Sequence, residues 1–319
     1  MDCTRAVTRA VAEFATAHLA GGTQVCVGLS GGPDSLALTA AALRAGLTVR
    51  ALIVDHALQP TSAAVAADAA RTAADLGASA QVLRVSVGTD GGMEAAARDA
   101  RYAALEDARD GLPLLLAHTM DDQAETVLLG LGRGSGARSL AGMRAWRAPW
   151  GRPLLGVRRS ETVGTCTELG LPAHADPHNR DPRFTRVRLR AEVIPLLDDV
   201  LHGGVVQALA RTATALQSDV AALDEIADDA FSRSARGGGA DTELDVDSVA
   251  RLPDAVRTRV VRRWLLEVGA TEPTTRVIEA ADDVVRGLRG GQVAVGGGPD
   301  HRLVAVRVDD VLRVRGITR

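Results

Sequence analysis

Short apolar runs alternate with amphipathic stretches through the first half of the chain. Four runs rich in aliphatic residues predict buried strands, one beginning at Val25 and the others covering 49–54, 81–87 and 112–117. The stretches between them have helical spacing and cover 36–43, 63–76 and 93–108. A repeated strand-then-helix order predicts an α/β fold with a doubly wound parallel sheet, whose ligands lie at the carboxyl ends of the strands.

The second half of the chain has a different pattern. Residues 201–231 predict one long helix, and the glycine-rich residues 234–242 predict a linker. One apolar stripe along that helix consists of Leu209, Leu216, Val220, Leu223, Ala227 and Phe231. A small α+β domain is predicted from helices 246–268 and 275–288 and strands 292–295, 303–308 and 311–314. We therefore predict a main domain over 1–200, a helical linker over 201–242 and a small domain over 243–319.

The composition predicts a packed core and no membrane segment. Hydrophobic residues make up 46% of the chain, yet no apolar run is long enough to cross a bilayer. Arg5, Arg9 and Glu13 interrupt the first nineteen residues, so we expect a soluble cytoplasmic protein. The three cysteines have no C-x-x-C spacing, which favours neither a disulfide framework nor a thiolate metal site. Cys26, inside the first predicted strand, is interpreted as a small core residue.

The charge is distributed unevenly. The net charge is −3, but residues 126–160 hold seven arginines and no acid. A solvated face normally mixes both signs, so this segment predicts an anion-binding surface. The chain contains no lysine, which excludes the G-x-x-x-x-G-K-[ST] phosphate loop of GTPases and related kinases.

The first predicted strand leads directly into a run of small and polar residues. The run is Leu29, Ser30, Gly31, Gly32, Pro33, Asp34 and Ser35. Glycines let a backbone approach an anion closely, and the N-terminus of the following helix contributes the positive end of its dipole. Ser30 and Ser35 add hydroxyl donors. The run therefore predicts a cradle for a phosphate chain, with these seven residues as its contacts.

Asp34 is the unusual member of this cradle. A carboxylate beside a polyphosphate is repelled unless a cation lies between them, so Asp34 predicts a bound Mg²⁺.

A second polar group follows the fourth predicted strand. His118, Asp122 and Glu125 have the i, i+4 and i+7 spacing of one helical face, which a core-facing stripe would fill with apolar residues. One interpretation is that these carboxylates hold Mg²⁺ or a cationic amine. The alternative is that Asp121 and Asp122 cap the helix and compensate its dipole.

Two further signals are ambiguous. Asp55 and His56 follow the second predicted strand and either contact ribose or adenine, or simply form a turn. His174 and His178 flank a short segment with metal-like spacing, but the prolines beside them favour a structural loop over a zinc site.

Five ordered motifs resemble those of known families. The segment S-G-G-P-D-S at 30–35 resembles the PP-loop of the N-type ATP pyrophosphatases. The other four resemble motifs of the tRNA(Ile)-lysidine synthetase family, and together the five span residues 25–200 in that family's order. They lie at 94–102, 118–126, 131–136 and 176–190. The last motif departs from the family pattern at His178, Phe184 and Val187.

The resemblance implies an ATP- and Mg²⁺-dependent ligase. ATP would adenylate the 2-carbonyl oxygen of the wobble cytidine in the CAU anticodon of isoleucine tRNA and release pyrophosphate. The ε-amine of free lysine would then displace AMP to form lysidine. The expected partners are this tRNA and lysine, without a membrane, and a homodimer is left open. Residues 1–200 would be the PP-loop catalytic domain, and residues 243–319 would bind tRNA.

The resemblance also implies roles for individual residues. The catalytic set would be Asp34, His118, Asp122, Glu125, Arg98 and Arg101. Of these, Asp122 and Glu125 would bind the lysine amine or Mg²⁺, and Arg98 or Arg101 would meet the lysine carboxylate or the base. The tRNA contacts would be Arg133, Arg138, Arg186 and Arg190. The rival interpretations are a tRNA 2-thiolation enzyme, an amidotransferase-type synthetase and an inactive tRNA-binding module.

Overall fold

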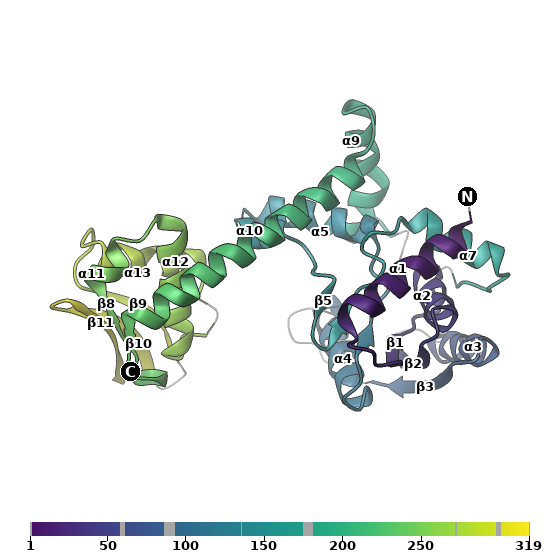
Figure 1. Cartoon of the computed structure of the whole chain (residues 1–319), viewed down its shortest axis with the longest axis horizontal. Coiled ribbons are helices and arrows are strands. Elements are labelled where there is room, and N and C mark those ends of the chain that lie inside the picture. The colour runs from purple at the N-terminus through teal and green to yellow at the C-terminus, as the bar shows by residue number, and fades with distance from the viewer. Residues whose placement is uncertain are drawn as a thin grey trace. The chain divides into compact units, whose positions relative to one another are not determined.

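The computed structural model describes residues 2–57, 61–85, 93–134, 136–174, 181–271, 273–297 and 301–318 (Figure 1). The chain forms two compact units, Met1–Thr214 and Ala215–Arg319, and the division falls inside one long helix. Each unit has a core of its own.

The first unit is built on a six-stranded sheet with the order β3-β2-β1-β4-β6-β5. The strands are β1 (Gln24–Gly28), β2 (Thr48–Asp55), β3 (Ser79–Arg84), β4 (Leu114–Leu115), β5 (Trp146–Arg147) and β6 (Trp150–Gly151). Every neighbouring pair is parallel except β5 with β6 at the edge. The predicted α/β sheet is therefore confirmed, with one antiparallel edge strand added.

Alternate residues of β1 face two separate layers of packing. Val25 and Val27 belong to the large core beneath α1 (Cys3–His18) and α2 (Pro33–Arg44). Cys26 points to the other face, where it packs with Leu105 of α4 (Met93–Ala108). This period-2 alternation between two buried faces is what a doubly wound sheet requires. It also confirms Cys26 as a core residue, since its side chain is fully buried.

Four further helices of the first unit are α3 (Ser62–Asp75), α5 (Met120–Arg133), α6 (Ala137–Leu140) and α7 (Arg159–Glu168). Helix α7 packs against both α1 and α2. Its last residue, Glu168, accepts hydrogen bonds from the backbone N–H groups of Cys3 and Thr4 at 3.0 and 2.9 Å. The hydroxyl of Thr4 donates to the same carboxylate at 2.6 Å, and this bond, followed by the two backbone bonds, lowers the pKa of Glu168 to about 2. The backbone bonds also satisfy orphan donors at the start of α1.

Several element boundaries in this unit differ from the predicted ones. The third strand covers 79–84 rather than 81–87, and residues 86 and 87 lie outside the described residues. The fourth strand contains two residues, not the six predicted over 112–117. The two-residue strands β5 and β6 are too short to leave a periodic signal, which is why the hydrophobic pattern missed them.

The long helix begins later than predicted. It is α10 (Val205–Ser234), and the preceding residues form α8 (Thr185–Arg188), a π-helical turn (Leu189–Val193) and α9 (Ile194–Val200). Gly203 and Gly204 have φ values of +91° and +78°, which end one helix before the next begins. The predicted stripe is confirmed, because Val220, Ala227 and Phe231 are buried and Leu209, Leu216 and Leu223 are half-buried.

The second unit contains a five-stranded antiparallel sheet with the order β7-β8-β11-β10-β9. The strands are β7 (Ala235–Arg236), β8 (Glu243–Asp245), β9 (Gln292–Gly297), β10 (His301–Val308) and β11 (Val311–Thr318). Helices α11 (Val246–Ala250), α12 (Asp254–Glu267) and α13 (Thr275–Val285) complete it. The fully buried side chain of Trp264 belongs to its core.

Two predictions for this unit need correction. The single helix expected over 246–268 is two helices, because Pro253 precedes α12 and disfavours helical geometry at the residue before it. The glycine-rich segment 234–242 includes β7, which pairs with β8, and a 3₁₀ turn at Gly239–Asp241. The assignment of 201–242 as a separate linker stays a prediction.

Among the described residues, no single helix has the length and apolar character to span a bilayer. The bent pair Thr185–Val200 and Val205–Ser234 meets that test only when both helices are taken together.

Candidate active site

The phosphate cradle predicted from the sequence is a tight turn between β1 and α2. The N–H group of Leu29 still donates to Leu52 of β2, so the strand geometry continues to the edge of the turn. Gly31 has a φ of +81°, and a Cβ at this position would lie 3.4 Å from Cβ of Ala69. Gly32 is the N-cap of α2 and Pro33 is its first residue. The conformation and the crowding explain why glycine is needed at Gly31.

Hydrogen bonds hold the turn in this shape. The Oγ atom of Ser35 donates to the carbonyl oxygen of Gly32 at 2.9 Å and lies 3.2 Å from the Oγ atom of Ser30. The predicted cradle residues are thus brought together at the N-terminus of α2. Such an end attracts anions through its free N–H groups.

Asp34, in the first turn of α2, is bound by two residues of α7. The Nε atom of Arg159 donates to Oδ2 at 3.1 Å, and the hydroxyl of Thr162 donates to Oδ1. Burial raises the pKa of Asp34, and the charge of Arg159 and the hydrogen bond from Thr162 offset only part of that rise. Residues more than 120 positions apart in the chain therefore meet at this carboxylate.

Asp122 caps α5 and reaches the same arginine. Its Oδ2 atom accepts hydrogen bonds from the N–H and hydroxyl groups of the N-cap residue Thr119, each at 2.8 Å. Its Oδ1 atom accepts a bond from Nη2 of Arg159 at 2.7 Å. Burial opposes the ionisation of Asp122, but Arg159 and Thr119 outweigh it and lower its pKa. The capping interpretation is confirmed for Asp122, which also has a place in the polar cluster.

Glu125 is the most deeply buried acid of the cluster, with no exposed surface. Arg190 donates from Nε to Oε1 at 2.7 Å, and Nη1 of Arg186 lies 3.6 Å from Oε2. The Oε2 atom makes no hydrogen bond within the described part of the chain. Burial raises the pKa of Glu125 in spite of Arg190. One oxygen of this carboxylate therefore has the guanidinium of Arg186 nearby but no hydrogen-bond donor among the described residues.

Arg159 joins all three acids, and sequence reasoning missed it as a site residue. Besides its bonds to Asp34 and Asp122, its Nη1 atom lies 3.9 Å from Oε1 of Glu125. It belongs to the acid-free segment that was predicted to be an anion-binding surface. The signal that could have found it is electrostatic, because one buried and two half-buried carboxylates elsewhere in the chain require counter-charges.

Neighbouring Arg158 makes a separate pair. Its Nη2 and Nε atoms donate to Asp121 at 3.1 and 3.2 Å. Two of the seven arginines of the acid-free segment thus bind acids of the protein itself.

His118 lies one residue before the N-cap of α5, not on the helix as predicted. Thr119 is the N-cap, and its backbone is still extended, so the helix begins only after it and His118 precedes the helix. Burial lowers the pKa of His118 to about 4, and the charges of Arg152, Arg101 and Arg186 add to the lowering. Its imidazole is therefore neutral at pH 7.

The two predicted arginines of α4 lie against an aromatic ring. The guanidinium groups of Arg98 and Arg101 each stand 5.5 Å from the ring centroid of Tyr102. Arg98 is exposed, whereas the Nε atom of Arg101 is buried without a hydrogen-bond partner among the described residues. Within the described residues neither arginine makes an ion pair with Asp34, Asp122 or Glu125, although the charge of Arg101 acts on His118.

Asp55 forms the turn that was one of its two interpretations. Its Oδ1 atom accepts a hydrogen bond from the N–H group of Ala57 at 3.0 Å, and bonds from Ser62 and Ala57 lower its pKa. The Nδ1 atom of His56 is buried without a described partner, and burial followed by the charge of Arg101 lowers the His56 pKa. A nucleotide contact of Asp55 or His56 stays a prediction.

The predicted tRNA contacts fall into two groups. Arg186 and Arg190 direct their guanidinium groups at Glu125, so the structure places them in the acid cluster. Arg133 ends α5 and Arg138 lies in α6, and both are exposed. The zinc alternative at His174 to His178 involves residues 175–180, which lie outside the described residues.

The predicted Mg²⁺ at Asp34 can be tested against the donor set. Magnesium requires several oxygen ligands in near-octahedral geometry. Both Asp34 oxygens have protein donors, and no three His, Cys, Asp or Glu side chains of the described residues form a group that could hold a metal ion. The residues as arranged do not fit a protein-held ion at Asp34, and the ion stays a prediction.

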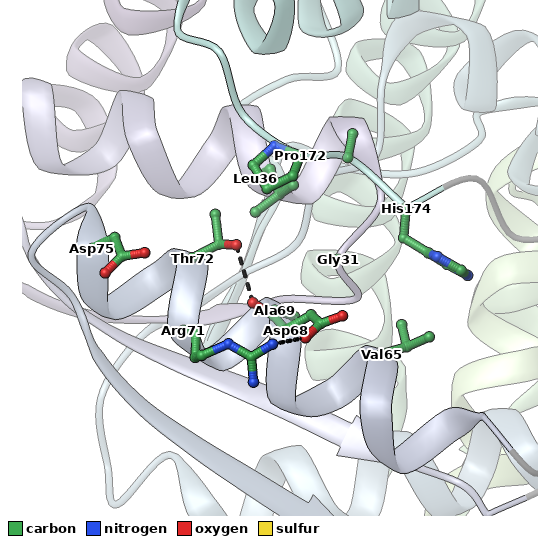
Figure 2. A pocket seen from close by; sticks show the side chains of 11 residues that line it. Gly31, Leu36, Val65, Asp68, Ala69, Arg71, Thr72, Asp75, Pro172 and His174 are labelled. Atoms are coloured by element: carbon green, nitrogen blue, oxygen red, sulfur yellow. Dashed lines mark hydrogen bonds and ion pairs between the residues drawn. The ribbon is translucent and has the colours of Figure 1, made fainter.

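Two cavities lie beside these elements. The larger, of about 530 Å³, is bordered by Gly31, by α3 and by residues 172–174, and Figure 2 shows Arg71 paired with Asp68 on its wall. The smaller, of about 390 Å³, is bordered by Glu125, Arg158 and Arg190 together with α9. The smaller cavity is therefore the one that adjoins the acid cluster.

Comparisons with known proteins agree with this geometry. The family model described as a PP-loop domain matches residues 3–197, and the TilS substrate binding domain matches residues 244–312. The tRNA(Ile)-lysidine synthase of Nocardia farcinica (strain IFM 10152) is 59% identical over 310 residues, covering 96% of each chain. That of Mycobacterium tuberculosis (strain ATCC 25618 / H37Rv) is 60% identical over 311 residues, again covering 96% of each chain.

A solved structure has the same fold. The U34-tRNA thiolase NcsA from Methanococcus maripaludis matches 67% of this chain and 79% of its own, with a TM-score of 0.55 and 18% identity, which shows the fold alone. The chain therefore belongs to the tRNA(Ile)-lysidine synthase family and is an ATP-using enzyme of tRNA modification.

Proposed function

We propose that the enzyme joins lysine to the 2-carbon of the wobble cytidine in the CAU anticodon of isoleucine tRNA. The observation that carries the proposal is the meeting of the PP-loop carboxylate Asp34 with the α5 carboxylates Asp122 and Glu125 around one guanidinium group. An ATP site and a site for a cationic amine are adjacent in such an arrangement. Family membership supports the same reaction.

The first step activates the base. The PP-loop N–H groups and the N-terminus of α2 hold the phosphates of ATP. The 2-carbonyl oxygen of the cytidine attacks the α-phosphorus, the bond to the β-phosphate oxygen breaks, and pyrophosphate leaves. The residues from Leu29 to Ser35 position the nucleotide for this attack.

The second step uses the buried acid. The Oε2 oxygen of Glu125, which has no hydrogen-bond donor among the described residues, receives the ε-ammonium of lysine. Because burial raises the pKa of Glu125, its carboxylate also accepts the proton that the amine loses. The amine then attacks the 2-carbon, the bond to the adenylated oxygen breaks, and AMP leaves. Asp122 is engaged by Thr119 and Arg159, so in this scheme it orients the site.

The remaining parts of the proposal concern partners and location. Mg²⁺ accompanies ATP, but no step is assigned to an ion at Asp34 because the described residues do not fit one there. The small domain contributes to tRNA binding, as its family match supports. The enzyme acts in the cytoplasm, and the proposed reaction does not depend on whether the enzyme forms a homodimer.

The test is a direct product analysis. The protein is incubated with ATP, labelled lysine and isoleucine tRNA with a CAU anticodon, and the tRNA is then digested to nucleosides. We expect one labelled nucleoside with the mass of lysidine and an equal amount of AMP. Methionine tRNA, which carries the same anticodon, is the control and should remain unlabelled. Label that stays as a lysine ester on the terminal ribose would contradict the proposal.

A further inference from the structure

The position of Asp34 sets an electrostatic problem for a phosphate cradle. It is the second residue of α2, directly after the N-cap Gly32 and Pro33. A helix N-terminus attracts phosphate because its free N–H groups carry positive partial charge. An uncompensated carboxylate in that first turn would repel a polyphosphate. The cradle therefore needs a positive charge beside Asp34.

Arg159 provides that charge from a distant part of the chain. Its Nε atom lies 3.1 Å from Oδ2 of Asp34, and Thr162, one turn further along α7, donates to the other oxygen. The Arg159 side chain is 23% exposed and that of Asp34 is 21% exposed, so water screens the pair only partly. Its guanidinium also binds Asp122 at 2.7 Å, which holds the group in place.

We propose that Arg159 is a positioning residue that neutralises Asp34 and thereby makes the PP-loop able to accept the polyphosphate of ATP. The inference rests on the proposed function only in placing ATP on the PP-loop. Arg159 acts through Asp34, so replacing Arg159 should weaken ATP binding only while residue 34 carries a negative charge. This condition separates the proposal from a purely structural role of the arginine.

A double-mutant cycle on nucleotide binding tests the inference. Binding of ATP is measured by calorimetry without tRNA, without lysine and with EDTA, so that neither turnover nor a metal ion contributes. We expect Arg159→Gln to weaken ATP binding at least tenfold. Asp34→Asn is the reference for the cycle, and the double variant should bind ATP within about threefold of Asp34→Asn.

The matched control lies one residue earlier. Arg158→Gln removes an arginine from the same helix start, but Arg158 pairs with Asp121 and makes no ion pair with Asp34. We expect this variant to bind ATP normally. Arg159→Lys, which keeps the charge, should recover most of the affinity lost in Arg159→Gln.

Several outcomes would overturn the inference. A double variant that binds ATP no more tightly than Arg159→Gln would show that the arginine does not act through Asp34. Repetition with Mg²⁺ exposes the alternative, because a tenfold loss in Asp34→Asn that appears only with the ion would make Asp34 a metal ligand. If Arg159→Gln does not fold, the comparison is made between Asp34→Asn and the double variant, where a tenfold difference contradicts the proposal. A failure to form lysidine would refute the proposed function while leaving this binding cycle interpretable.

Discussion

Arg190 donates a hydrogen bond from Nε to Oε1 of Glu125 at 2.7 Å, although 65 positions separate the two residues in the chain. The bond leaves the second oxygen of Glu125 without a hydrogen-bond donor among the described residues. A buried carboxylate oxygen without a hydrogen-bond donor lowers the stability of the folded protein unless a ligand donates to it. The pair therefore holds Glu125 in one orientation, with its Oε2 atom 3.6 Å from Nη1 of Arg186, and Oε2 is the oxygen that the proposed reaction uses.

Replacement of Glu125 by Gln should separate the two half-reactions. Loss of a charge-assisted hydrogen bond costs about 1.5–3 kcal/mol, so the lysine concentration needed for turnover should rise roughly 10- to 100-fold. Adenylate formation should change less, since the PP-loop is intact. A lysine titration beside a lysine-free adenylation assay measures both. If adenylation fails while lysine affinity is normal, Glu125 serves ATP rather than the amine.

The stability of the protein should fall in mild acid because of His118. Its pKa is about 4 in the folded protein and about 6.5 in the unfolded chain, so the unfolded chain binds more protons between these values. The stabilisation is complete above pH 7 and is lost as the pH falls towards 4. Replacement by Gln should therefore reduce the change in unfolding free energy between pH 7.5 and 5 by up to about 2 kcal/mol. Urea unfolding at both pH values is the measurement.

The control for this experiment is His202, an exposed residue of the turn before α10. Its replacement by Gln should leave the pH dependence of unfolding as it is. An unchanged pH dependence in the His118 variant would show that other groups cause the acid sensitivity.

The buried ion pair of the second unit should be sensitive to the loss of one partner. Arg257 binds Asp282 through Nε at 2.6 Å and Nη2 at 3.2 Å, and their side chains are 5% and 8% exposed. Replacement of Arg257 by Met strands a buried carboxylate and should cost about 3–5 kcal/mol of unfolding free energy. Adding Asp282→Leu should recover a large part of that loss.

Denaturant unfolding of the full chain measures these costs. The matched control is Arg236→Met, because the Arg236 side chain is 79% exposed and its Nη2 atom lies 4.0 Å from Oδ2 of Asp245. Its loss should cost less than about 1 kcal/mol. Equal costs at the two positions would mean that burial does not govern the Arg257 pair.

Replacing both Arg133 and Arg138 by Ala should lower the affinity for tRNA and make that affinity less dependent on salt. Each lost phosphate contact lowers the slope of log K against log salt by roughly 0.7 to 0.9. The slope is measured by filter binding over a salt series. Arg9→Ala, an exposed residue of α1 paired with Glu13, is the control. An unaltered slope in the double variant would place these arginines away from the tRNA path.

The parts of the fold that the sequence revealed are those with strong local signals. The alternation of Val25, Cys26 and Val27 marks a strand buried on both faces, and the two glycines after it mark the turn. The acids Asp122 and Glu125 were predicted as a pair because polar residues stood where a core stripe was expected. Their counter-charges were not predicted as such, since Arg159, Arg186 and Arg190 come from remote segments and pairing across such distances leaves no periodic signal.

The same limit explains the misplaced elements. The break at Pro253 has a local cause, because proline disfavours helical geometry at the residue before it, whereas the apolar spacing continues on both sides. The short strand β6 pairs with β4, and β5 pairs with β6, so both strands depend on partners that only the folded chain supplies.

Helix α7 is anchored at both of its ends. Its first residue, Arg159, is bound to Asp34 and Asp122, and its last residue, Glu168, is bound to the N–H groups of Cys3 and Thr4. The start of α1 and the PP-loop carboxylate Asp34 are therefore connected through the two ends of one helix. We expect a purification tag fused before Asp2 to weaken nucleotide binding more than the same tag fused after β11.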